Sequence, residues 1–227
     1  MWGQPPLAVR RAERGWLIPH AVRRIIAEVM VIVPGSKQRA TRQSFSGRVF
    51  HMKAFGAIQI RSLNQHDPPV IAAAFASIGS VKPEATYHLY LEQEAAGSRT
   101  SLVATVDEEF AGYLTINWQP TYPGFAELEI PEIQDLNVLP TFRRRGIASR
   151  LLDLAEAQVA RRYRVVGIGV GLHAGYNAAQ RLYGLRGYIP DGRGVIYRNQ
   201  YVGQYVQIML DDDLVLHLTK QLGIEHP

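Results

Sequence analysis

The chain has 227 residues, of which 47% are hydrophobic and 20% are charged, a composition typical of a globular protein with a full core. It contains no cysteine, which excludes disulfides, zinc–thiolate sites and a cysteine nucleophile. No apolar run approaches the ~20 residues that a membrane span requires. We therefore expect a cytoplasmic protein with no membrane segment.

The net charge of +5 is unevenly distributed. Residues 1–53 contain ten Lys/Arg and two Glu, whereas residues 54–227 contain fifteen Lys/Arg and eighteen Asp/Glu. We predict a basic N-terminal extension over 1–53, disordered or with one short helix over 21–33, and a folded domain over 54–227. Three alternatives for the extension stay open. It resembles a transit peptide, it could serve as a tether to nucleic acid or membrane, or the true start of the protein is Met52. The domain is mildly acidic, so we expect no nucleic-acid surface on it.

From Phe55 onward the pattern of apolar residues predicts regular elements. The first half is expected to contain a strand, two helices, a hairpin and an irregular third strand: 57–63, 67–79, 83–97, 100–106, 109–118 and 126–140. Asp67 is the expected N-cap of the first helix. The second half is expected to contain a helix, a buried strand, a short helix and a closing strand: 147–159, 165–173, 177–185 and 214–222. This order indicates one mixed α/β domain around a single sheet.

The helix over 147–159 follows an unusual turn, Thr-Phe-Arg-Arg-Arg-Gly at 141–146. A strand that leads directly into a helix leaves the first helical N–H groups unpaired, and the helix dipole adds partial positive charge there. Phosphate is the usual ligand of such a site. Gly146 permits close approach of the backbone, Ser149 offers a hydroxyl, and the three arginines add charge. A solvated basic turn is the alternative.

Other phosphate motifs are absent or unconvincing. The sequence has no P-loop motif, and Gly169–Ala174 matches the dinucleotide pattern G-x-G-x-x-A only formally. Gly169 and Gly171 fall inside the predicted strand over 165–173, so we interpret the match as a structural coincidence.

Two segments together resemble the GNAT superfamily of acetyl-CoA-dependent N-acetyltransferases. Arg143-x-x-Gly146-x-Ala148 is similar to the family signature Q/R-x-x-G-x-G/A. The segment 177–192, which contains Tyr183, resembles the family's N-x-x-A-x-x-L-Y-x-x-x-G-F/Y motif. The resemblance covers roughly residues 56–220.

The resemblance implies a central, mixed but mostly antiparallel twisted sheet, flanked by helices, whose fourth and fifth strands are parallel and splay apart around coenzyme A. It implies acetyl-CoA as cosubstrate, held by backbone groups of the fourth strand, by the amides of the turn and by Asn177. The implied cosubstrate-binding residues are Leu136, Val138, Arg143, Arg144, Arg145, Gly146, Ile147, Ala148, Ser149, Asn177 and Tyr183.

Because cysteine is absent, the resemblance implies direct attack of an amine on the thioester. Tyr183 is the expected acid for the leaving thiolate, and Glu132 is our first choice of base among four carboxylates, the others being Glu127, Glu129 and Asp135. The seven histidines form no H-E-x-x-H motif, so no metal is implied. We expect an N-acetyltransferase for a primary amine of a small molecule or peptide, with a homodimer as one option. A non-catalytic acyl-CoA sensor is the alternative function.

Overall fold

The computed structural model of the chain describes residues 56–223. The expected helix over 21–33 and the rest of the N-terminal extension lie outside the described residues. None of the described helices has the length and apolar character needed to cross a bilayer.

One eight-stranded sheet organises the domain, in the order β1-β2-β3-β4-β5-β8-β6-β7. Every neighbouring pair is antiparallel except β4 and β5, which are parallel. The expected mixed, mostly antiparallel sheet with a parallel central pair is therefore confirmed. The strands are β1 Ile58–Ser62, β2 Arg99–Val106, β3 Glu109–Asn117, β4 Glu132–Val138, β5 Val165–Gly171, β6 Ile189–Tyr197, β7 Gln200–Tyr201 and β8 Leu214–Gln221.

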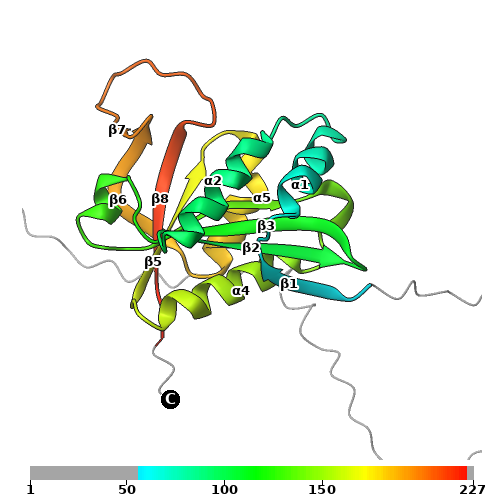
Figure 1. Cartoon of the computed structure of the whole chain (residues 1–227). Coiled ribbons are helices and arrows are strands. Elements are labelled where there is room, and N and C mark those ends of the chain that lie inside the picture. The colour runs from blue at the N-terminus through cyan, green and yellow to red at the C-terminus, as the bar shows by residue number, and fades with distance from the viewer. Residues whose placement is uncertain (1–55, 224–227) are drawn as a thin grey trace, which may run out of the picture. The chain divides into compact units, whose positions relative to one another are not determined.

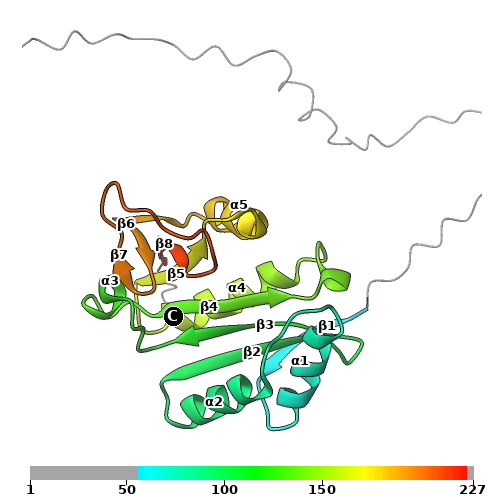
Figure 2. The same cartoon turned by 90° about the horizontal axis from the view of Figure 1, so that it is seen from above.

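Five α-helices flank this sheet among the described residues: α1 Asp67–Ala76, α2 Glu84–Ala95, α3 Pro123–Ala126, α4 Ile147–Ala160 and α5 Asn177–Leu185. Figure 1 shows α1 and α2 above strands β2 and β3, and α4 below them. The view from above shows the same layering, with β6, β7 and β8 grouped beside β5 (Figure 2).

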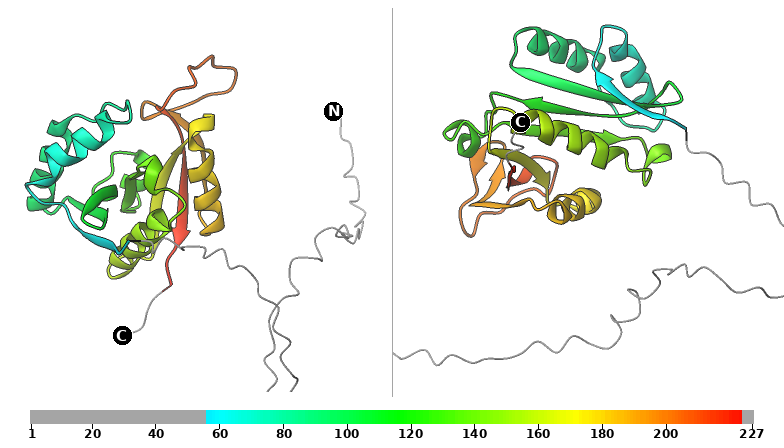
Figure 3. Two further views of the ribbon diagram at one scale, coloured as in Figure 1. Left: turned by 90° about the vertical axis from the view of Figure 1, so that its right-hand side faces the viewer. Right: turned by 90° about the horizontal axis from the view of Figure 1, so that it is seen from below.

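The core follows from the amphipathic pattern of α4 and the apolar strands. Ile147, Leu151, Ala155 and Val159 recur every fourth residue and are buried, so they form the stripe that packs on the sheet. Leu152 is buried beside this stripe, whereas Leu154 is 43% exposed. Figure 3 shows α4 lying across the sheet from below.

Two sequence predictions about elements were wrong, and two strands were missed. The strand expected from residue 126 begins at Glu132, because Pro123–Ala126 form α3 and Glu129 adopts a left-handed φ of 52°. The strands β6 and β7 were not predicted. Asp67 is the first residue of α1 and not its N-cap; its carboxylate accepts hydrogen bonds from the N–H of Asn64 and from Arg61.

Candidate active site

A cleft opens where the parallel strands β4 and β5 separate. The two strands pair at only two positions, where the first two residues of β4 meet the middle of β5: Glu132 with Gly167 and Ile133 with Ile168. Beyond that point they diverge, and a cleft of about 500 Å³ lies there. Its lining comes from β4, β5, α5, β8 and the loops around them, and includes Lys82, Glu132, Asp135, Leu136, Tyr176, Tyr183, Arg198, Asp212, Asp213 and His217.

A β-bulge in β4 shapes one wall of this cleft. The register between β3 and β4 shifts after Tyr113, and Asp135 adopts a left-handed φ of 53°. The extra residue re-aims side chains locally, as bulges do near functional sites. The hydroxyl of Tyr90 on α2 donates a hydrogen bond to the Asp135 carboxylate, which fixes the bulge against the helix.

Glu132, at the start of β4, is a buried carboxyl group at the floor of the cleft. It is 5% exposed, and Gln134 Nε2 donates a hydrogen bond to its Oε2 at 2.7 Å. Burial raises the pKa of Glu132 to about 7, against the opposing effect of the Gln134 hydrogen bond. A carboxyl group with a pKa near neutrality can accept a proton and release it again at physiological pH.

Three glycines of β5 let neighbouring side chains pack closely against the strand below the cleft. Gly167, Gly169 and Gly171 alternate along the strand, so they share one face of the sheet. A Cβ on Gly167 would lie 2.3 Å from the Phe125 ring, and a Cβ on Gly171 would lie 2.4 Å from the Tyr176 ring. The glycine pattern therefore serves strand packing, which supports our interpretation of Gly169–Ala174 as no dinucleotide motif.

Tyr183 lines the cleft from helix α5. It is 5% exposed, and burial raises the pKa of its phenol, so the group stays protonated well above neutral pH. Tyr176, at the start of the same helix, also lines the cleft and donates to Asp212 Oδ1 at 3.1 Å. The cleft thus contains a carboxyl group able to accept a proton and a phenol able to donate one.

The basic turn before α4 presents free backbone donors. Arg150 donates the first backbone hydrogen bond of the helix, to the carbonyl of Gly146 at 3.0 Å. Among the described residues the N–H groups of residues 144–149 find no acceptor. Arg144 and Gly146 both have left-handed φ values, 60° and 80°, which turn these N–H groups outward. Such a nest of N–H groups is a ready anion site.

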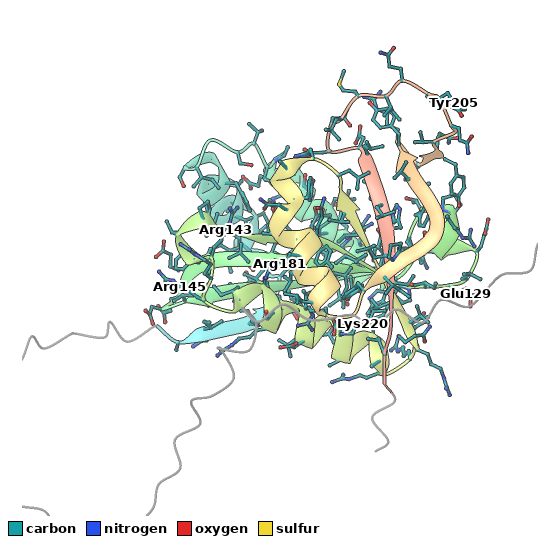
Figure 4. The ribbon with its side chains drawn as sticks, turned by 180° about the vertical axis from the view of Figure 1, so that it is seen from behind. Glu129, Arg143, Arg145, Arg181, Tyr205 and Lys220 are labelled. Carbon is teal, nitrogen blue, oxygen red and sulfur yellow. The ribbon has the colours of Figure 1, made fainter. Side chains whose placement is uncertain are left out.

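Two of the three arginines of this turn are held by local contacts. Arg143 Nε donates to the carbonyl of Val138 at 3.0 Å, and the Arg145 guanidinium lies 5.2 Å from the centre of the Phe142 ring. Figure 4 shows Arg143 and Arg145 at the end of the domain away from the loop that carries Tyr205. Arg144 and Arg145, with Arg150, line a separate hollow beside β1.

The structure brings some of the predicted residues together and separates others. Glu132, Leu136 and Tyr183 line the cleft, whereas Asn177 is exposed at the start of α5. Val138 and residues 143–149 lie beyond the cleft lining, at and after the end of β4.

The expectation that Glu127 and Glu129 lie on the strand leading to the site was wrong. Both precede β4; Glu127 is paired with Arg193 at 2.9 Å, and Glu129 lies in an exposed turn. The carboxylates of Glu132 and Asp135 do line the cleft.

Sequence reasoning missed His217, which lines the cleft from β8. It is 5% exposed, and its Nε2 lies 3.7 Å from Glu132 Oε1. The signal that was available is weak: a single histidine in an apolar strand, in the run Val-Leu-His-Leu. The contact of His217 with Glu132 becomes visible only in the folded sheet, where His217 pairs with Gly169 of β5.

Comparisons with known proteins agree with this architecture. The model of the acetyltransferase (GNAT) family matches residues 59–188, more than half of the chain. A search of curated proteins finds no match.

Solved structures give the same fold. A putative GNAT acetyltransferase from Desulfovibrio desulfuricans is 18% identical, with a TM-score of 0.56 over 74% of this chain and 100% of that one. A ribosomal-protein-alanine N-acetyltransferase from Brucella melitensis is 22% identical, with a TM-score of 0.53 over 72% and 99%. A putative acetyltransferase from Salmonella typhimurium, solved with acetyl-CoA, is 19% identical, with a TM-score of 0.54 over 75% and 96%. The chain therefore belongs to the acetyltransferase (GNAT) family, a family of acyltransferases.

Proposed function

We propose that the protein transfers the acetyl group of acetyl-CoA directly to a primary amine of a small-molecule or peptide acceptor. The observation that carries the proposal is the cleft between the splayed ends of β4 and β5, which contains both Glu132 and Tyr183. The two side chains come from different elements. The carboxyl group of Glu132 can accept a proton, and the phenol of Tyr183 can donate one. A cleft of this kind can hold two reactants in line between an acid and a base.

The chain's free backbone groups fit a pyrophosphate and an extended acyl arm. The unpaired N–H groups of residues 144–149 would bind the pyrophosphate, with Arg143, Arg144 and Arg145 nearby. Leu136 lies where β4 has parted from β5, so its backbone would bind the acyl arm as an added strand does. The carbonyl of Val138 accepts from Arg143, and we assign the polarising N–H to Leu136. Asn177, at the start of α5, would border this arm.

Acetyl-CoA supplies an activated carbonyl, and the residues of the cleft move the protons. The acceptor's ammonium group loses a proton to the Glu132 carboxylate, and the free amine then forms the new C–N bond as the C–S bond breaks. The phenol of Tyr183 gives its proton to the departing thiolate, and the second proton that the attacking nitrogen loses on becoming an amide restores the phenol. The raised pKa of Tyr183 keeps that proton available, and the pKa of about 7 at Glu132 suits a base at neutral pH.

The charge of the cleft supports a cationic acceptor. Four carboxylates line it, from Glu132, Asp135, Asp212 and Asp213, against the two cations of Lys82 and Arg198. Arg198 is itself paired with Asp213 at 3.1 Å. An excess of negative charge attracts ammonium groups and raises their local concentration. The Brucella structure named as a ribosomal-protein-alanine N-acetyltransferase makes a peptide α-amine one acceptor to test.

The test is an acceptor screen with the purified protein and acetyl-CoA. The panel contains a polyamine, an aminoglycoside and short peptides with free α-amines, and the readouts are release of free thiol and the mass of the acetylated product. Amine-dependent thiol release supports the proposal, and Tyr183→Phe should then lower kcat by about 10- to 100-fold with little change in acetyl-CoA affinity. Saturable acetyl-CoA binding without release would favour a non-catalytic acyl-CoA sensor. No binding at all contradicts both functions.

A further inference from the structure

Glu132 and His217 reach each other across a strand that separates them. Glu132 lies on β4 and pairs with Gly167 of β5; His217 lies on β8 and pairs with Gly169 of β5. Paired residues of neighbouring strands point to the same face of a sheet, so the two side chains stand on either side of β5 on the cleft face. Their nearest atoms, His217 Nε2 and Glu132 Oε1, are 3.7 Å apart.

Gly169 leaves the face of β5 beside this contact free of a side chain. A Cβ at this position would lie 3.5 Å from Glu132 Oε1, 3.5 Å from His217 Nε2 and 3.0 Å from Val215 Cγ1. Any larger side chain would occupy the space through which the two groups face each other. The glycine thus opens a passage from β4 to β8 over the middle strand.

Aromatic rings fix the plane of the imidazole. The ring of His217 stacks on Tyr122, with centroids 3.7 Å apart and planes 10° apart. Phe125 meets it edge to face at 5.2 Å. Tyr122 is held in turn by a hydrogen bond from its hydroxyl to Asp191 Oδ2 at 2.6 Å. The imidazole therefore has little freedom to turn, and Nε2 stays directed toward Glu132.

The burial of Nδ1 decides which nitrogen carries the proton. Nδ1 of His217 is buried and has no hydrogen-bond partner. An orphaned N–H donor in this position would be costly, whereas a proton on Nε2 faces the Glu132 carboxylate. Burial also lowers the pKa of His217 to about 4, so the ring is neutral at pH 7 and carries a single N–H.

We propose that His217 is a positioning residue whose Nε2–H holds Oε1 of Glu132, so that His217 and Gln134 together fix both oxygens of the carboxylate. A contraction of less than about 1 Å would bring the 3.7 Å contact to hydrogen-bond distance. Gln134 Nε2 already donates to Oε2. With both oxygens engaged, the carboxylate would keep one orientation toward the acceptor. The role of Glu132 as the base rests on the proposed function, whereas the contact between His217 and Glu132 does not.

Other charged groups also face this pair. Arg99 of β2 bonds Gln134 Oε1 at 3.2 Å and lowers the pKa of Glu132, whereas Asp135 raises it. Asp191 of β6 faces His217 and raises its pKa, against the larger effect of burial. The remaining charged groups of the cleft are Lys82, Arg198, Asp212 and Asp213. All of them are unchanged in the variants below, so a difference between variants reports on His217.

Nuclear magnetic resonance on the full chain, without any ligand, tests the proposal. Nitrogen-15 spectra of the histidines report the tautomer of His217, which is assigned by its absence in His217→Phe. Carboxyl carbon-13 spectra follow the titration of Glu132, assigned by its absence in Glu132→Gln. We expect the Nε2–H tautomer, and a titration midpoint of Glu132 that rises by about one pH unit in His217→Phe because the carboxylate loses a donor.

Further variants separate positioning from simple packing. His217→Gln keeps an N–H donor and should return the midpoint toward the wild-type value. Gly169→Ala keeps both groups but adds a Cβ 3.5 Å from each of them and 3.0 Å from Val215 Cγ1, and should raise the midpoint as His217→Phe does. His88→Phe, at an exposed position outside the cleft, should leave it unchanged.

Two results would overturn the proposal: an Nδ1–H tautomer, or a midpoint that neither His217→Phe nor Gly169→Ala moves. If His217→Phe does not fold, the tautomer of His217 in the wild type and the titration midpoint of Glu132 in Gly169→Ala still test the proposal. Failure of the proposed function has a different signature. In that case Glu132→Gln leaves amine-dependent thiol release unchanged, or no release is found, while both spectroscopic readouts remain interpretable.

Discussion

Tyr90 donates a hydrogen bond from its hydroxyl to the carboxylate of Asp135, which lies 45 residues further along the chain. The bond joins helix α2 to the bulge of β4, where Asp135 has a left-handed φ. The Arg99 guanidinium covers the Tyr90 ring at 4.5 Å from its centre. A helix on one face of the sheet thus supports the bulge that shapes the cleft.

Replacing Tyr90 with Phe should remove this support without removing the ring. The Asp135 carboxylate would lose a donor in a partly buried position, so we expect the free energy of unfolding to fall by about 1–3 kcal/mol. Urea denaturation measures it, with a lower midpoint and an unchanged m-value. Tyr205→Phe, in a fully exposed ring, is the matched control and should change nothing. Equal stability of both variants would show that the hydroxyl contributes no net stabilisation.

The turn before α4 predicts a ranking of two substitutions. Gly146 has a φ of 80° and open space around its Cα, so Gly146→Asp introduces backbone strain and negative charge but no clash. We expect a loss in acetyl-CoA affinity of about tenfold or more. Arg144→Ala removes one exposed charge and should cost about two- to fivefold. Calorimetric titration measures both. The reverse order would mean that the arginine side chains, and not the backbone N–H groups, bind the phosphates.

The spacing of apolar residues predicts a helix or strand that buries one face. It does not predict an element that is mostly exposed. The helix α4 was predictable because its apolar residues recur at helical spacing. Strand β6 was not, because only Ile196 along it is buried and two glycines with positive φ interrupt it. Ala126, Leu128 and Ile130 alternate with glutamates and so resemble a strand, yet Leu128 is 62% exposed in a turn.

The site shows the same division. Gly146 and Tyr183 lie in short local motifs, so the sequence locates them directly. The contact of Glu132 with His217 depends on the order of strands β4, β5 and β8, with the glycine of the middle strand between them. Strand order is a property of the assembled sheet and leaves no local pattern in the chain.

The glycines of β5 allow a direct test of close packing. A Cβ at Gly167 would lie 2.3 Å from a ring carbon of Phe125, and that ring is confined by Tyr122 and His217. Gly167→Ala should therefore destabilise the fold by about 1–3 kcal/mol. Gly184→Ala is the matched control: nothing lies near its Cβ, and in helix α5 alanine should stabilise by about 0.5–1 kcal/mol. If thermal melts show both variants equal to wild type, β5 tolerates a side chain on its cleft face.

The titration of Glu132 predicts how stability changes with pH. Burial raises the pKa of Glu132 from 4.5 to about 7, so the folded state binds this proton more tightly than the unfolded state does. The resulting stabilisation is complete below pH 4.5 and is lost as the pH rises through 7. His217 has the opposite sign: its pKa falls from 6.5 to about 4, so its contribution is complete above pH 6.5 and is lost as the pH falls through 4.

Glu132→Gln should remove the first of these dependences and leave the second. Relative to wild type, the variant should gain up to roughly 3 kcal/mol of stability between pH 5 and pH 8, since each unit of pKa shift corresponds to about 1.4 kcal/mol. Urea denaturation at a series of pH values measures the difference. The control Glu109→Gln changes an exposed carboxyl group and should run parallel to wild type. A Glu132→Gln curve that also runs parallel would mean that the Glu132 carboxyl titrates in the folded protein as it does in the unfolded chain.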